Sequence, residues 1–64
     1  MNIGDKLRQI RKNQRIRQQT IAEVIGVAVD TYRRWEGGKH SIKAEKLKRL
    51  SEVLNVPIGE LLAE

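Results

Sequence analysis

Cations make up most of the charged side chains in this sequence that could bind a ligand. Thirteen of the 64 residues are Lys or Arg and eight are Asp or Glu, which gives a formal net charge of +5. Six of the cations fall between residues 6 and 17, a stretch without any acidic residue. Guanidinium and ammonium groups gathered in this way favour a polyanionic partner. The alternative is a solvated face that keeps a small domain in solution.

Residues suited to catalysis or to metal binding are scarce. The chain has a single histidine, His40, and no cysteine, so it offers neither a disulfide nor the usual ligands of a zinc site. Its carboxylates form no inward-facing pair; Glu23, Glu45 and Glu52 fall on polar helix faces. We therefore expect no enzyme activity, no metal, no cofactor and no small-molecule ligand.

The targeting signals are equally limited. No apolar run is long enough to span a bilayer, and residues 1–9 lack the apolar centre of a signal peptide. We expect no membrane partner and a location in the cytoplasm.

Helices must position the cations, because the apolar residues recur at helical spacing. Ile3, Leu7 and Ile10 form one stripe, and Leu47 and Leu50 belong to another. No alternating stretch longer than four residues predicts a strand. The pattern predicts an all-α fold in one compact domain, residues 1–64, with helices at about residues 3–13, 18–25, 29–36, 44–54 and 58–63.

The second and third of these helices are separated by a glycine. Gly26 follows the last apolar residue of the second helix, where a left-handed cap is accessible mainly to glycine. The third helix has Tyr32 and Trp35 on one side and Arg33 and Arg34 away from it. Two helices joined by a glycine turn can place the second one in a DNA groove.

The combined spacing resembles the Cro/phage-repressor-type helix-turn-helix family, also called the xenobiotic-response-element family. Its strongest part is Gln-x-x-Ile-Ala-x-x-x-Gly from Gln18 to Gly26, followed nine residues later by Trp35 and Glu36. Further matching residues run along nearly the whole chain: Ile3, Gly4, Arg8, Val27, Tyr32, Gly38, Lys39, Leu47, Leu50, Leu54, Val56, Pro57, Leu61 and Leu62. The resemblance implies a five-helix lambda-repressor-like domain that is encoded by a bacterium or a phage.

The resemblance also implies sequence-specific binding of double-stranded DNA, with helix 29–36 in the major groove. The expected role is that of a transcriptional regulator that reads a two-fold symmetric operator, and a repressor is favoured over an activator. The residues expected to face bases are Ala28, Val29, Asp30, Arg33 and Arg34. An arginine among them could bond guanine O6 and N7, and Asp30 could accept from a cytosine amino group. As alternatives, Asp30 could instead complement the helix dipole and both arginines could touch only phosphate.

A second set of residues is expected at the phosphates. Gln18 resembles the glutamine that the family places at the start of the second helix against the DNA backbone, and helix N-termini themselves favour phosphate. The full set of expected phosphate contacts is Arg8, Arg11, Arg15, Arg17, Gln18, Thr31, Lys39 and Lys43.

Arg11 and Glu36 can pair in this family. We favour a buried pair that locks the first helix to the end of the third, and breaking it would cost about 3–5 kcal/mol. The alternative is an exposed pair that contributes less than about 1 kcal/mol.

We expect a homodimer, at least on DNA, with contacts from Ile58, Leu61 and Leu62. The chain ends at Glu64 directly after the last expected helix, so a missing C-terminal dimerisation domain is an alternative. A protein-binding regulator or antitoxin component with the same fold is the rival function, and its binding would not fall steeply with salt.

Overall fold

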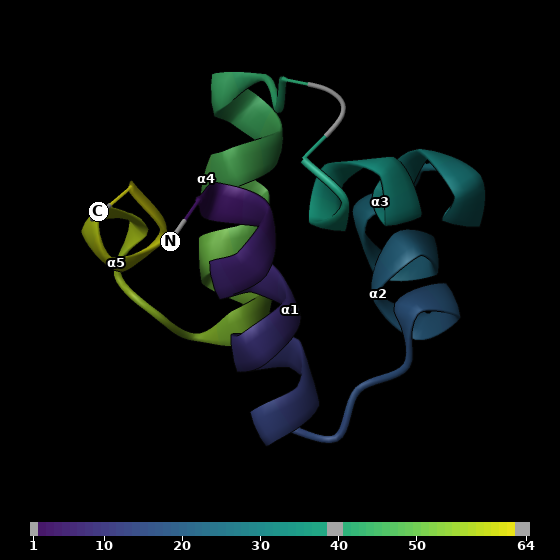
Figure 1. The fold of residues 1–64 in the computed structure, drawn as a ribbon, viewed down its shortest axis with the longest axis horizontal. Helices are drawn as coiled ribbons and strands as arrows, with labels where there is room; N and C mark the ends of the chain where they lie inside the picture. Colours follow the sequence, from purple (N-terminus) through teal and green to yellow (C-terminus); the bar gives the residue numbers. More distant parts are fainter. Residues whose placement is uncertain (1, 39–40, 63–64) are drawn as a thin grey trace.

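The computed structural model describes residues 2–38 and 41–62. Within this part of the chain there are five helices and no strand, so the predicted all-α, five-helix class is confirmed. The helices are α1 (Ile3–Asn13), α2 (Gln18–Ile25), α3 (Val29–Glu36), α4 (Ala44–Leu54) and α5 (Ile58–Leu62). In Figure 1, α2 and α3 lie on one side of α1 and α4, and α5 lies on the other. Residue 63, expected to close the last helix, lies outside the described residues.

Several helix ends follow from local chemistry. Asn2 caps α1, because its side-chain oxygen accepts a hydrogen bond from the Asp5 amide at 2.9 Å. Gly26 ends α2 with φ 87° and Asn55 ends α4 with φ 58°, the left-handed caps that these residue types tolerate best. Arg15 has φ 58° as well, in the turn between α1 and α2.

The core lies where the five helices meet. Its fully buried side chains are large and mostly aliphatic: Leu7, Ile21, Tyr32, Leu50, Leu54 and Leu61. Tyr32 and Trp35 of α3 pack edge to face, with ring centroids 6.0 Å apart. α3 therefore turns both of its aromatic side chains inward.

α1 passes very close to the end of α3. A Cβ atom placed on Gly4 would lie 2.5 Å from the Trp35 carbonyl oxygen and 2.6 Å from the Glu36 carbonyl oxygen. Only glycine allows this approach without movement of the backbone. The contact sets the position of α3 relative to the first turn of α1.

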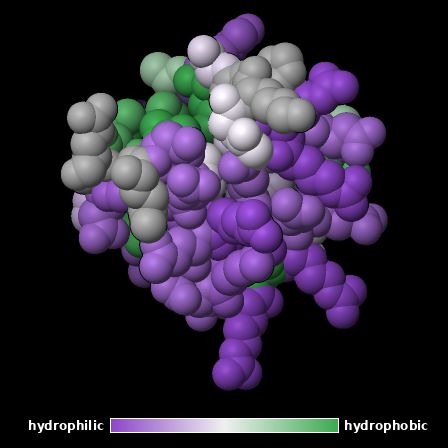
Figure 2. Space-filling view, viewed as in Figure 1, coloured by the Kyte–Doolittle hydropathy of each residue, from purple (hydrophilic) through white to green (hydrophobic). Residues whose placement is uncertain are grey.

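The surface is mostly polar, and Figure 2 shows hydrophobic residues gathered at the upper left of one face. The exposed large apolar side chains include Val24, Ile58 and Leu62. Leu61 differs from the expectation that it makes dimer contacts: it is 1% exposed, because the fourth position of the short α5 turns into the core. No helix in the described ranges is both long enough and apolar enough to cross a membrane.

Candidate nucleic-acid interface

The two faces of α3 differ sharply. Tyr32, Trp35 and Glu36 are buried, whereas Asp30, Arg33 and Arg34 are exposed. This separation follows from helical spacing, because residues three and four apart share a face. The outer face of α3 is thus free to meet a ligand, while the inner face holds the helix in place.

Two other expected base contacts lie at the start of α3. Ala28 is exposed at the N-cap position, and it makes no side-chain capping bond. Val29 is half-buried and packs against the core. The structure therefore places Ala28 on the outer face and leaves only part of the Val29 side chain accessible.

The polar groups of the α3 outer face are connected to one another. Arg33 Nη1 lies 3.3 Å from Asp30 Oδ1, in an exposed ion pair. Arg33 Nε also donates a hydrogen bond to Gln18 Oε1 at 3.2 Å. The link from α3 to the first residue of α2 was not predicted from the sequence, because Gln18 and Arg33 are 15 positions apart.

Arg11 and Glu36 form an ion pair between α1 and α3. Arg11 Nε lies 2.6 Å from Glu36 Oε2, and Arg11 Nη2 lies 3.1 Å from Glu36 Oε1. The two side chains are 9% and 3% exposed. Gln18 Nε2 donates a third hydrogen bond to the same carboxylate at 3.0 Å, so one buried anion joins three helices.

The ionisation of this cluster follows from its contacts. Burial alone would raise the pKa of Glu36, but the hydrogen bonds from Arg11 and Gln18 outweigh it and hold that pKa below its usual range. The bond to Glu36 in turn raises the pKa of Arg11. Glu36 is therefore an anion and Arg11 a cation at neutral pH.

The Tyr32 hydroxyl lies beside this pair. It is buried and has no hydrogen-bond partner among the residues that the structure describes. Burial raises its pKa strongly, so the phenol is neutral. It therefore adds no charge to the cluster.

Arg11 differs from the expectation that it touches phosphate. Its third nitrogen, Nη1, donates to the Ile16 carbonyl oxygen at 2.7 Å, and the residue is 7% exposed. All three guanidinium nitrogens form hydrogen bonds inside the protein, so this side chain stabilises the packing of α1 and does not lie at the surface.

The other expected phosphate contacts are on the surface. Arg8, Arg15, Arg17 and Lys43 are exposed, and Gln18 and Thr31 are half-buried. Arg17, the N-cap residue of α2, makes no side-chain capping bond within the described residues, so the first backbone amides of the helix are available to an anion. Lys39 lies outside the described residues.

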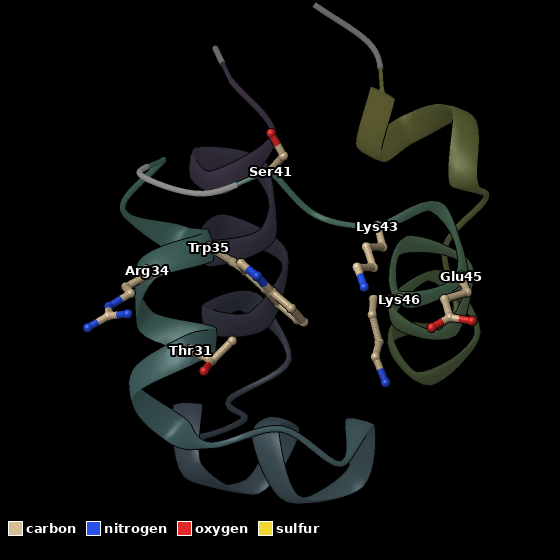
Figure 3. A pocket seen from close by; sticks show the side chains of 7 residues that line it. All are labelled: Thr31, Arg34, Trp35, Ser41, Lys43, Glu45 and Lys46. Atoms are coloured by element: carbon tan, nitrogen blue, oxygen red, sulfur yellow. The ribbon is translucent and has the colours of Figure 1, made fainter.

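A cavity of about 380 Å³ lies between α3 and the start of α4. Its lining includes Thr31, Trp35, Lys43 and Lys46, and Figure 3 shows the Trp35 ring extending from α3 toward the two lysines. Arg34 extends away from them, toward the outside of α3. Lys46 was not among the expected contacts, although its position three residues after Lys43 places both on one side of α4.

No cluster of potential metal ligands occurs within residues 2–38 and 41–62. What the surface offers instead is hydrogen-bond donors and positive charge around the outer face of α3. Such donors suit phosphate oxygens and the acceptor atoms of base edges.

Known proteins share both the sequence and the arrangement. A family model described as helix-turn-helix matches residues 7–61. The cryptic phage CTXphi transcriptional repressor RstR of Vibrio cholerae is 36% identical over 61 residues, 95% of this chain and 55% of that protein. The HTH-type transcriptional activator BcrR of Enterococcus faecalis is 35% identical over 63 residues, 98% of this chain and 31% of that protein. The chain thus spans about half and about a third of these relatives.

Solved structures agree with the sequence matches. The solution structure of the DNA-binding domain of the P22 c2 repressor superposes with a TM-score of 0.92 and 29% identity, covering 97% of this chain and 82% of that one. The restriction-modification controller protein C.AhdI from Aeromonas hydrophila shares the fold, with a TM-score of 0.87, 24% identity, and coverage of 92% and 89%. The resemblance to phage repressors inferred from the sequence is confirmed, and the chain belongs to the helix-turn-helix family.

Proposed function

We propose that this chain binds double-stranded DNA as the DNA-binding part of a transcriptional regulator, with α3 in the major groove. A repressor is favoured over an activator. The outer face of α3 carries this proposal: Asp30, Arg33 and Arg34 are exposed on a helix whose other face is fixed in the core. A major groove about 12 Å wide admits one such helix. The relatives support a role in transcriptional regulation, since one is named a transcriptional repressor and the other a transcriptional activator.

The proposed contacts divide into two classes. Ala28, Asp30 and Arg34, with the accessible part of Val29, face base edges. The surrounding side chains meet phosphates and position the helix without reading sequence: Arg8, Arg15, Arg17, Gln18, Thr31, Lys39 and Lys43.

A two-fold symmetric operator suits this arrangement. We infer a homodimer on DNA, with Ile58 and Leu62 at the contact, because these apolar side chains are 39% and 55% exposed. Two recognition helices roughly 34 Å apart would read half-sites one turn apart. The proposed activity is binding without a catalytic step, and its proposed location is the cytoplasm.

Selection from random DNA tests the proposal directly. The purified protein is expected to enrich a palindromic sequence, and log K for the selected duplex is expected to fall with log salt at about 0.9 per phosphate neutralised. Failure to enrich any duplex would contradict the proposal. Together with binding that is insensitive to salt, it would favour the protein-binding or antitoxin role.

A pair of exposed lysines provides a matched control. Lys43→Ala is expected to reduce the salt slope by about 0.9, because Lys43 lies next to α3 at the proposed phosphate path. Lys48→Ala removes the same charge from α4 in a groove near Pro57 and Ile58, and is expected to leave the slope unchanged. Equal effects of the two substitutions would mean that only net charge matters.

A further inference from the structure

Gln18 stands between the buried ion pair and the outer face of α3. Its Nε2 donates to Glu36 Oε1 at 3.0 Å, and its Oε1 accepts from Arg33 Nε at 3.2 Å. A primary amide carries two N–H donors, and the bond to Glu36 uses one of them. Both ends of the Gln18 amide are therefore held, and one donor is left over for a DNA phosphate.

Arg33 continues this chain of bonds to Asp30. Its Nη1 lies 3.3 Å from Asp30 Oδ1, while its Nε is bound to Gln18. The Asp30 side chain is 78% exposed and the Arg33 side chain is 58% exposed. One exposed bond would leave these two side chains free to move, so several bonds must act together to hold them in place. An aspartate close to DNA is repelled by the phosphates, and an adjacent guanidinium offsets that repulsion.

We propose that Gln18 is a positioning residue for sequence reading: through Arg33 it fixes the Asp30 carboxylate that meets a base, and Arg33 itself reads none. The inference rests on the proposed DNA-binding function and revises the role expected for Arg33. The buried Glu36 anchors Gln18, Gln18 anchors Arg33, and Arg33 holds Asp30. The contact of Gln18 with phosphate and the reading of a base by Asp30 are consequently coupled through one side chain.

Arg34 lies outside this chain of bonds. It extends away from α4 on the outer side of α3 (Figure 3), and no hydrogen bond or ion pair of its side chain is found within the described part of the chain. Of the two neighbouring arginines, Arg34 is thus the one free to bond guanine. This difference explains how adjacent residues of one type take different roles.

Discrimination between duplexes measures the proposed coupling. Kd is measured for the selected operator and for duplexes that carry single base-pair changes along each half-site. At the base pair that Asp30→Ala no longer distinguishes, Gln18→Ala and Arg33→Ala are expected to lose discrimination too, by up to the roughly 5- to 150-fold that one base contact provides. The double variant Gln18→Ala/Arg33→Ala is expected to lose no more discrimination than Arg33→Ala alone, because Gln18 acts through Arg33.

Two further variants separate positioning from charge and from nonspecific damage. Arg33→Lys keeps the charge but replaces the planar fork, whose Nε bonds Gln18 and whose Nη1 bonds Asp30, with a single ammonium nitrogen on a flexible stem. It is therefore expected to lose discrimination and to keep its affinity for random DNA. Gln19→Ala removes a neighbouring amide whose one side-chain bond in the described part of the chain is to Glu23, and it is expected to change neither discrimination nor affinity for random DNA. If Gln18→Ala weakens all duplexes equally and keeps full discrimination, the positioning role is overturned.

A measurement without DNA keeps this inference distinct from the proposed function. Hydrogen exchange of the Arg33 Nε–H, followed by NMR in the free protein, is expected to be faster in Gln18→Ala and unchanged in Gln19→Ala. An unchanged rate in Gln18→Ala overturns the coupling even if DNA binding is established. Failure of the parent protein to select any duplex overturns the reading role of Asp30 together with the proposed function, even if the exchange result supports the Gln18–Arg33 bond.

Discussion

Replacing Glu36 by glutamine is expected to destabilise the fold severely. The carboxylate of Glu36 accepts two bonds from Arg11 and one from Gln18, and the Arg11 and Glu36 side chains are 9% and 3% exposed. Removal of its charge leaves the guanidinium buried without a counterion, at a cost of about 3–5 kcal/mol. A 64-residue domain has about 3–10 kcal/mol of stability in total, so Glu36→Gln is expected to be close to unfolding at 25 °C.

Urea denaturation followed by circular dichroism measures this loss. The control is Asp30→Asn, which breaks the exposed pair with Arg33 and is expected to cost less than about 1 kcal/mol. The double variant Arg11→Met/Glu36→Leu removes both charges, and it is expected to recover most of the stability. A loss below about 1 kcal/mol in Glu36→Gln would refute the view that the pair is buried and energetically coupled.

The same pair predicts a pH dependence. Because the folded-state pKa of Glu36 lies below its ordinary value of 4.5, its contribution to the free energy of unfolding is fully present above that value. The contribution is lost as the pH falls through the folded-state pKa. The stability difference between the parent protein and Glu36→Gln is therefore expected to shrink below about pH 4.5, whereas a constant difference would contradict the assignment.

Three further predictions concern single positions. Gly4→Ala places a Cβ 2.5 Å from the Trp35 carbonyl oxygen and is expected to cost about 1–3 kcal/mol in urea unfolding. Gly59→Ala adds a Cβ that meets nothing within 4 Å among the described residues and is expected to cost nothing; equal effects would exclude the close approach. Tyr32→Phe removes a buried hydroxyl that has no hydrogen-bond partner among the described residues, so its melting temperature is expected to be unchanged or higher, and a clear decrease would show that this hydroxyl is hydrogen-bonded. Arg34→Ala is expected to weaken operator binding by about 1–3 kcal/mol more than random-DNA binding in titrations, and equal losses would assign Arg34 to phosphate.

The helices of this fold could be predicted because their signals are local. Leu7, with Ile3 and Ile10, marks one buried stripe, and Gly26 marks a left-handed cap that few other residues tolerate. Each of these inferences depends only on residues within a turn or two. The resemblance to phage repressors added the expectation of a lambda-repressor-like domain.

The details of the site depended on contacts between distant residues. Gln18 was predicted to start α2 near phosphate, but its bonds to Glu36 and Arg33 depend on how α2 and α3 cross. Leu61 was expected at a dimer contact because a five-residue helix gives too short a pattern to tell its inner face from its outer one. Spacing alone cannot supply such tertiary geometry.

The separation of the two α3 faces has a consequence for changing the target of this protein. Substitutions at exposed helix positions usually change stability by no more than about 0.5 kcal/mol, whereas Tyr32, Trp35 and Glu36 are committed to the interior. Asp30 and Arg34 can therefore be randomised together in a library whose members keep the parent fold. New DNA preferences are reachable by changing the outer face alone, provided that the glutamine at the start of α2 is retained.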